Sequence, residues 1–433
     1  MKIIFKKLIV TIITWESRMI LAKYKPKIIA VTGNVGKTST KDAIYTVLST
    51  SMFVRKSDKS FNSDTGVPLT ILGCPNGWTN PFAWLSNIIH GLELIVVTRP
   101  YPKVLILEVG ADRPGDIKNI AAWLKPDTVV LTRFSQVPVH VEFFESRAEL
   151  IKEKGYLVEA LKPGGTLVLN FDDADVMNFK ARSKGKWVTY GFQPGADILG
   201  SHETIQTKEK KGVELPTGVG FRIDWNGNSM PVVLNGVLGL QHLYPVLAAV
   251  AVGSTENLNM VTITQALLNH IPPRGRMNVL EGVNTCTVID DTYNSSPVAV
   301  HEALDTLKKM TIKGRKIAVL GDMLELGKYS IDAHKKAGEH AAQIVDLLIV
   351  VGLRALYIKE GALEKGLASR KMFVFENSNI AASEIAAKIK KGDVVLVKGS
   401  QSMRMERIVE KLLAEPTKKG ELLVRQEEEW LRR

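Results

Sequence analysis

The sequence predicts an α/β protein with two successive sheet domains. The first is a central domain of the phosphate-loop type with a mostly parallel sheet, and the second is a Rossmann-like C-terminal domain. Three observations lead to this prediction. Short apolar runs typical of buried strands alternate with segments of helical spacing. A Gly-Lys-Thr turn joins the first strand to a helix, and Pro272-Pro273 separates two stretches of this alternation.

The length of 433 residues allows two or three domains that each bury a core. We expect a basic, apolar helix over residues 1–26, a central domain over 27–272, the C-terminal domain over 273–415 and a charged tail over 416–433. Within the central domain, residues 196–234 form short alternating segments separated by Gly, Asn and Pro. This pattern predicts a small antiparallel β excursion.

Composition excludes several classes of protein. Lys and Arg exceed Asp and Glu by 57 to 45, but they are spread along the chain without interleaved aromatic residues, so no nucleic-acid partner is expected. We attribute the net charge of +12 to attraction toward small anionic substrates or an anionic membrane surface. Cys74 and Cys286 lie far apart without a CxxC motif, which excludes a zinc ribbon and fits a reducing cytoplasm.

Two apolar stretches raise the question of membrane contact. Residues 1–15 begin like a signal peptide, but Glu16 and Arg18 stand where a small-residue cleavage site would be. Their apolar run is too short to span a bilayer. A helix packed on the first domain and an interfacial membrane anchor both remain open, and the packed helix is the simpler interpretation. Residues 82–97 are interrupted by a histidine and a glutamate, which favours a buried helix.

Residues 27–42 (KIIAVTGNVGKTSTKD) predict a strand, a phosphate-binding loop and a helix. The glycines let backbone N–H groups approach an anion, and the positive end of the helix is directed at the same point. Lys37 would reach the β- and γ-phosphates, and the Thr38 hydroxyl would bind Mg²⁺. The first glycine of the full GxxxxGK[ST] motif would fall on Val31, so only the shorter TGxxGKT form is present. The predicted nucleotide-binding residues here are Gly33, Asn34, Val35, Gly36, Lys37, Thr38 and Ser39.

Glu108 is a candidate Mg²⁺ ligand because of its position in the sheet. It stands at the end of a buried strand predicted over residues 103–109, and the carboxyl ends of parallel strands form the edge where α/β sheets bind ligands. A solvated acid at the end of a strand is the alternative. For His140 and Lys154 the residues alone favour a structural histidine and a solvated helix face.

Several motifs follow one another in an order known from one enzyme family. After TGNVGKTSTK come NSDTGVPLT, LEVGADRPGDI, HVEFF, KGYLVEAL, RGRM, IDDTYNSSP, LGDMLELG and VKGSQSMRMERIVE. In this ordered set the chain resembles the Mur ligases over roughly residues 27–413, and within them the MurF branch, which joins UDP-N-acetylmuramoyl-tripeptide to D-alanyl-D-alanine. The resemblance implies an ATP-dependent carboxylate–amine ligase of peptidoglycan precursor synthesis that acts in the cytoplasm.

The resemblance implies a site with two Mg²⁺ ions. In this family the glutamate of the LEVGA-type strand end binds Mg²⁺, which corresponds to Glu108. The histidine of the HxE segment binds a second Mg²⁺, which corresponds to His140. Lys154 matches a lysine that is carbamylated and supports the second ion. Addition of CO₂ would convert this cation into an anion, which explains a lysine beside metal ions.

The resemblance also implies nucleotide contacts from the second half of the chain. Arg276 matches the arginine of the family's GRM motif, and Asp290 or Asp291 matches the acid that holds the ATP ribose. His242 stands in QHLYP, where the family has HNxxN near the adenine, and Asn294 stands in YNSSP, where the family has YNANP. The chemistry implied is phosphorylation of a muramoyl-peptide carboxylate by ATP, followed by attack of a dipeptide amine.

The chain also departs from its family. Only about 26 residues precede the phosphate loop, where typical members have a domain that holds the UDP sugar, so we expect that domain to be absent. Residues 1–20 could then bring the enzyme to the inner face of the membrane. Two alternatives remain: a Mur-fold ligase with another acceptor, similar to folylpolyglutamate synthetase or to ligases that build poly-amino acids, and an inactive nucleotide-binding scaffold at the membrane.

Overall fold

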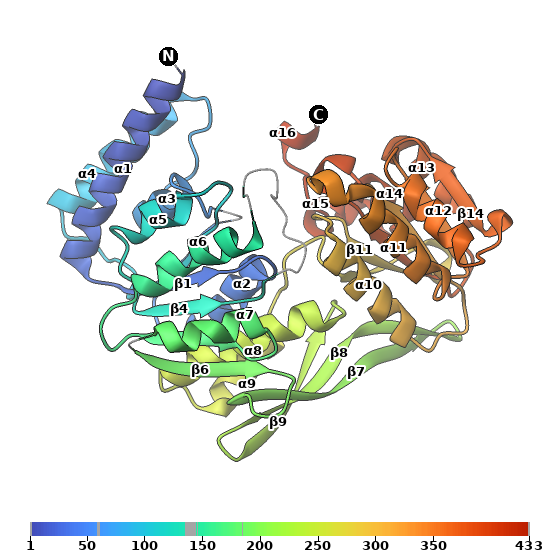
Figure 1. Cartoon of the computed structure of the whole chain (residues 1–433), viewed down its shortest axis with the longest axis horizontal. Helices are drawn as coiled ribbons and strands as arrows, with labels where there is room; N and C mark the ends of the chain where they lie inside the picture. The colour runs from blue at the N-terminus through green and yellow to red at the C-terminus, as the bar shows by residue number, and fades with distance from the viewer. Residues whose placement is uncertain (1, 59–60, 135–143, 145, 184, 432–433) are drawn as a thin grey trace.

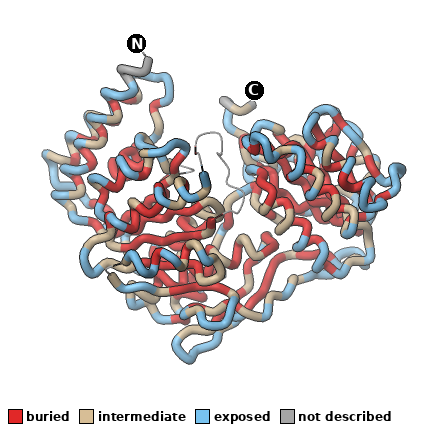
Figure 2. The backbone as a smooth tube through the Cα atoms, viewed as in Figure 1, coloured by how far each residue is buried: buried red, intermediate tan, exposed pale blue. Residues whose placement is uncertain are grey.

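The computed structural model describes residues 2–58, 61–134, 144, 146–183 and 185–431. Two sheet domains lie side by side, and a pair of helices projects from the first domain on the side away from the second (Figure 1). Most of the parallel strands in both domains are buried, whereas much of the projecting helix pair is exposed (Figure 2). The prediction of a mostly parallel sheet domain followed by a Rossmann-like α/β domain is confirmed.

The sheet of the central domain has the strand order β2-β3-β1-β4-β5-β6-β7-β8-β9 within the described residues. Strands β1 to β6 pair in parallel, and β7, β8 and β9 form the antiparallel excursion. The central strands are buried on both faces, so their sequences are continuous apolar runs. The strands are β1 (Lys27–Thr32), β2 (Val54–Lys56), β3 (Val104–Glu108), β4 (Thr128–Leu131), β5 (Thr166–Asn170), β6 (Lys186–Gly191), β7 (Ile198–Lys210), β8 (Val213–Trp225) and β9 (Asn228–Asn235).

Helices cover both faces of this sheet and divide its core into two clusters. One face packs against α2 (Lys37–Leu48), α8 (Leu240–Thr255) and α9 (Met260–Leu268). The other face packs against α3 (Gly66–Leu72), α5 (Asp116–Ala121), α6 (Arg147–Glu159) and α7 (Ala174–Met177). Because β1 has α2 directly after it, the loop between them opens at the carboxyl edge of the sheet.

The C-terminal sheet has the order β10-β11-β15-β12-β13-β14 in the described part of the chain, with only β10 antiparallel. Its strands are β10 (Asn278–Glu281), β11 (Thr287–Asp291), β12 (Lys316–Gly321), β13 (Leu347–Val351), β14 (Met372–Phe375) and β15 (Val394–Lys398). Helices α10 (Pro297–Lys309), α11 (Ser330–Ala342) and α12 (Leu356–Glu364) cover one face, and α13 (Ser378–Ile385) and α14 (Glu406–Leu412) cover the other.

The charged C-terminal segment packs onto the second domain through two short helices, α15 (Lys419–Leu422) and α16 (Glu428–Leu431). Leu423 is buried in the core cluster beside α14. The Arg425 guanidinium donates to the backbone oxygens of Thr292 and Tyr293 and forms an ion pair of 2.8 Å with Glu406. The segment therefore supports the loop that follows β11.

Helix α1 (Lys2–Tyr24) packs against α3 and α4 (Pro81–Val96) through Ile9, Ile13 and Ile20. The prediction that residues 82–97 form a buried helix is wrong. Only one face of α4 is buried, and its other face carries exposed large apolar side chains. Periodicity showed that α4 has an apolar stripe but could not show whether another element covers it. Among the described residues, no helix combines the length and apolar character needed to cross a membrane.

Glu16 of α1 is buried against α4. Neither carboxylate oxygen has a hydrogen-bond partner among the described residues, and one lies where a side chain at Gly91 would have to be. Burial raises the pKa of Glu16 from 4.5 to about 7. The unfolded chain therefore gives up its proton at lower pH than the folded chain, and the packing of α1 loses stability as the pH rises from 4.5 through about 7.

We expect Glu16→Gln to stabilise the packing of α1 by about 2 kcal/mol at pH 8 and to have little effect at pH 4.5 and below. Glutamine keeps the shape of the side chain and removes the cost of ionising it in a buried place. Hydrogen exchange of the α1 backbone amides, measured at both pH values, checks this prediction. Glu159→Gln, on the exposed face of α6, is the matched control. Equal stabilisation at both pH values would contradict it.

Candidate active site

The phosphate loop between β1 and α2 has a conformation that requires its glycines. Gly33 has φ 146°, and a Cβ there would lie 1.9 Å from Thr132 Oγ1, so a larger residue does not fit. Gly36 has φ 85° and caps the N-terminus of α2. The Asn34 N–H donates to the Arg133 backbone oxygen at 2.8 Å. The end of β4 therefore holds the loop in place.

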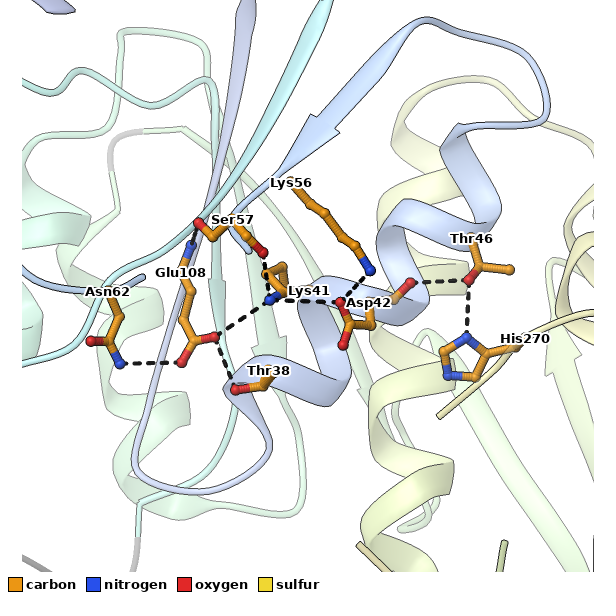
Figure 3. A network of polar contacts seen from close by, with 9 residues as sticks. All are labelled: Thr38, Lys41, Asp42, Thr46, Lys56, Ser57, Asn62, Glu108 and His270. Carbon is orange, nitrogen blue, oxygen red and sulfur yellow. Dashed lines mark hydrogen bonds and ion pairs between the residues drawn. The ribbon is translucent and has the colours of Figure 1, made fainter. Parts of the chain in front are cut away.

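Glu108 stands at the centre of a polar network under this loop (Figure 3). Its Oε2 accepts a hydrogen bond of 2.9 Å from Thr38 Oγ1, and its Oε1 accepts one of 3.3 Å from Asn62 Nδ2. Lys41 Nζ lies 4.0 Å from Oε2 and donates to the Ser57 backbone oxygen at 2.7 Å. The network joins residues from α2, β3 and the segment after β2, which are neighbours because β1 lies beside β3.

Lys154 is buried on α6 and lines the same cavity as Lys37. Burial first, and then the nearby positive charge of Lys37, lower the pKa of Lys154 to about 7. The pKa of Lys37 is also lowered, chiefly by burial. Glu153, next to Lys154 in sequence, instead accepts from the backbone N–H groups of Ile117 and Lys118 at the start of α5. The cavity thus holds two lysine side chains whose charged forms are disfavoured.

The cavity has a volume of about 380 Å³ and is lined by both domains. This size is typical of small-molecule sites. The residues that the sequence predicted and that line it are Gly33, Asn34, Val35, Gly36, Lys37, Thr38, Ser39, Glu108, Lys154, His242, Arg276, Asp291 and Asn294. His140 lies outside the described residues. Within the described ranges, no group of three or more His, Cys, Asp and Glu side chains is placed to hold a metal ion.

Asp290 and Asp291 have different surroundings. Asp291 lines the cavity, and its Oδ2 accepts from Lys398 Nζ at 2.6 Å. Asp290 is fully buried behind it and accepts from the backbone N–H and the hydroxyl of Thr292. Burial raises the pKa of Asp290 to about 7. Of the two acids that the sequence left open, only Asp291 is placed to meet a ligand.

His242 and Arg276 meet at the joint between the domains. The carbonyl oxygen of Arg276 accepts from His242 Nε2 at 2.5 Å, which places the imidazole proton on Nε2. Burial lowers the pKa of His242 to about 4, so the ring is neutral near pH 7. The Arg276 guanidinium stacks 4.2 Å from the centre of the Tyr293 ring. Arg276 and Tyr293 both line the cavity.

An ion pair joins the two domains beside the cavity, and Glu302 is the member that lines it. Arg133, after β4, pairs with Glu302 on α10 at 2.6 Å, and its guanidinium also lies 5.1 Å from the centre of the Tyr244 ring. Burial lowers the pKa of Arg133, whereas the Glu302 carboxylate raises it. The net effect is a raised pKa. Sequence analysis missed this pair, since its members are far apart in the chain.

The protein is a two-domain α/β protein in which a phosphate-loop domain and a Rossmann-like domain line one cavity. Residues 86–253 match the Mur ligase middle domain, and residues 275–401 match the Mur ligase glutamate ligase domain. The matched segments together span more than half of the chain, which belongs to the Mur ligase family.

Its relatives include the MurF ligases. The chain is 27% identical to the UDP-N-acetylmuramoyl-tripeptide–D-alanyl-D-alanine ligase of Bacillus subtilis, over 90% of this chain and 76% of that protein. It superposes on MurF ligase from Thermotoga maritima in complex with ADP with a TM-score of 0.73 and 25% identity, over 93% of this chain and 83% of the other. The folylpolyglutamate synthase of Mycobacterium tuberculosis shares the fold with a TM-score of 0.63 and 15% identity, over 91% and 93% of the two chains.

Proposed function

We propose that this protein is an ATP-dependent ligase of peptidoglycan precursor synthesis that joins a muramoyl-peptide carboxylate to D-alanyl-D-alanine through an acyl phosphate. The observation that carries the proposal is the convergence of the phosphate loop, the Thr38–Glu108 pair and Lys154 in one cavity between two Mur ligase domains. Similarity to proteins named as this ligase, over nine tenths of the chain, supports the same substrates.

The proposed reaction has two steps. A carboxylate oxygen of the muramoyl-peptide attacks the γ-phosphorus of ATP, and ADP leaves. The amine of the dipeptide then attacks the acyl carbon, and the tetrahedral intermediate expels phosphate to leave an amide. Lys37 and the backbone N–H groups of the phosphate loop would offset the charge on the transferring phosphoryl group. In this scheme the protein supplies position and positive charge rather than a nucleophile of its own.

Thr38 and Glu108 fit a Mg²⁺ site. Their oxygens lie 2.9 Å apart at the carboxyl edge of the sheet, and both are the hard oxygen donors that Mg²⁺ prefers. A bound Mg²⁺ would neutralise phosphate charge during the transfer. Asn62 and Lys41 fix the orientation of the Glu108 carboxylate. For a second ion the proposal includes His140 and Lys154, as the family resemblance implies.

We also propose that Lys154 carries a carbamate. Two ammonium groups in one buried cavity repel each other, and addition of CO₂ to Lys154 would turn that repulsion into attraction for Lys37 and for Mg²⁺. The new C–N bond forms between Nζ and the carbon of CO₂, and Nζ gives up a proton. Nucleotide contacts from Arg276, His242, Asp291 and Asn294 complete the proposed site.

Because the proposed substrates are precursors made inside the cell, we place the reaction in the cytoplasm, with residues 1–20 directed to the inner face of the membrane. The basic and apolar character of these residues supports this placement.

Glu108→Gln is expected to raise the Mg²⁺ concentration needed for half-maximal activity and to lower kcat by roughly 100-fold. The amide keeps the shape of the side chain but removes the charge that would hold the cation. A Mg²⁺ titration of phosphate release measures both effects. Glu159→Gln on exposed α6 should behave as the parent protein. An unchanged Mg²⁺ requirement in Glu108→Gln would exclude this residue as a ligand.

The proposed function is tested by phosphate release from ATP with UDP-N-acetylmuramoyl-tripeptide and D-alanyl-D-alanine. Release is expected only when both substrates are present, and mass spectrometry should show the joined product. Single amino acids and glutamate-containing compounds are tested in parallel as alternative amine acceptors. Turnover with a single amino acid, and none with the dipeptide, would reject the proposed acceptor and favour a Mur-fold ligase of another kind.

A further inference from the structure

Helices α1 and α4 carry an apolar surface that the rest of the described chain does not cover. On α4 the exposed side chains follow one another at spacings of three and four residues, which places them along one face of the helix. Phe82 and Val96, at its two ends, are each 80% exposed. We call this set of residues the two-helix surface: Leu8, Trp15 and Met19 of α1 with Phe82, Leu85, Ile89, Leu92 and Val96 of α4.

The opposite face of α4 accounts for its fold, so the exposed stripe is not needed for packing. Trp84, Asn87, Gly91 and Leu94 are the buried residues of α4. Lys23 Nζ donates to the backbone oxygens of Leu94, Ile95 and Val97, which fixes the end of α4 against the end of α1. An exposed apolar stripe of this extent on a packed helix marks a surface for a partner.

The charges around the two-helix surface indicate an anionic partner. Residues 2–24 and 81–99 contain six basic residues and two acids, an excess of four positive charges. Glu93 and Arg99 form an ion pair and cancel each other, and the other acid, Glu16, is buried. Lys6, Lys7 and Arg18 are exposed. A second copy of this chain would bring the same positive charge and be repelled, whereas a bilayer with anionic lipids attracts it.

We propose that the two-helix surface docks on a bilayer that contains anionic lipids, with the stripe of α4 among the acyl chains and the basic residues at the headgroups. Helices that lie at a membrane interface combine an apolar face, basic residues beside it and a tryptophan. Trp15 is the exposed tryptophan of this surface. The two helices project from the central domain, away from the C-terminal domain (Figure 1). The proposal specifies the membrane contact suggested for residues 1–20 and adds α4 to it.

Sedimentation with lipid vesicles tests this inference without reference to activity, so its outcome is independent of the ligase assignment. The full chain is expected to bind vesicles of phosphatidylcholine and phosphatidylglycerol at least about tenfold more tightly than vesicles of phosphatidylcholine alone. Ile89→Glu should weaken binding to the mixed vesicles by roughly tenfold or more, because it places a charge in the middle of the stripe. Leu353→Glu is the matched control, since Leu353 is 75% exposed in the C-terminal domain.

A second variant separates charge from apolar contact. Lys6→Glu with Lys7→Glu should weaken binding to the anionic vesicles by about tenfold and leave binding to neutral vesicles unchanged. Circular dichroism and phosphate release, unchanged in all variants, would show that each is folded. Absence of vesicle binding by the parent chain would overturn the proposal. So would a dimer in light scattering that Ile89→Glu dissociates, since a second copy would then cover the surface.

Discussion

Replacing Lys37 by alanine is expected to lower the rate of phosphate release by roughly 10³-fold or more. Lys37 follows Gly36 at the start of α2, and it shares the cavity with the Thr38–Glu108 pair. In the proposed mechanism, its ammonium group is the charge directed at the β- and γ-phosphates. Removing it leaves the charge of the transferring group without its main protein partner. Steady-state kinetics at saturating ATP measure the loss in kcat.

The control for this experiment is Lys208→Ala, on the exposed part of β7 far from the phosphate loop in sequence. It removes the same charge from the protein without touching the cavity, and it should leave kcat unchanged. If Lys37→Ala kept its activity to within about tenfold of the parent protein, the phosphate loop would not be the site of phosphoryl transfer.

Lys154→Ala is also expected to abolish turnover, with a loss of roughly 10³-fold. The prediction follows from the proposed carbamate, which would supply a negative charge inside the cavity. A short carboxylic acid added to Lys154→Ala could occupy the vacated space and should restore part of the activity. Lys154→Arg should stay inactive, because a guanidinium remains positive and does not form a carbamate under these conditions.

The chain offers a close control in Lys152, which lies two residues earlier on the same helix and is exposed. Lys152→Ala should retain full activity and should not respond to added carboxylic acids. Activity of Lys154→Arg equal to that of the parent would show that a positive charge is what the site needs, and the carbamate would then be wrong.

Local sequence patterns predicted those parts of the site that lie within one motif. The strand, loop and helix around Gly33, Gly36 and Lys37 were predicted because glycine and helix-terminus chemistry act over a few residues. Glu108 was predicted as a candidate from its place at the end of an apolar strand. Its contact with Thr38, seventy positions earlier, depends on the pairing of β1 with β3, which the sequence does not specify.

Other parts of the site needed the fold. Sequence analysis missed Lys41 and Asn62, although Lys41 stands one helical turn after Lys37 and Asn62 lies in the NSDTGVPLT motif. The positions of these two residues in the sequence could therefore have identified them as candidates. The Arg133–Glu302 pair offered none, because only the packing of the two domains brings it together. Asp290 and Asp291 were equivalent in sequence. Both are buried, and they differ because only Asp291 lines the cavity.

The account rests on the claim that a carboxylate becomes an acyl phosphate in this cavity. Muramoyl-tripeptide with ¹⁸O in both oxygens of the reacting carboxyl group tests it directly, with ATP and D-alanyl-D-alanine as the other substrates. Amide formation through an acyl phosphate should transfer one ¹⁸O atom to each phosphate released, as mass spectrometry of the phosphate would show. Phosphate without ¹⁸O would mean that water attacks ATP in this site, and it would contradict the ligase mechanism.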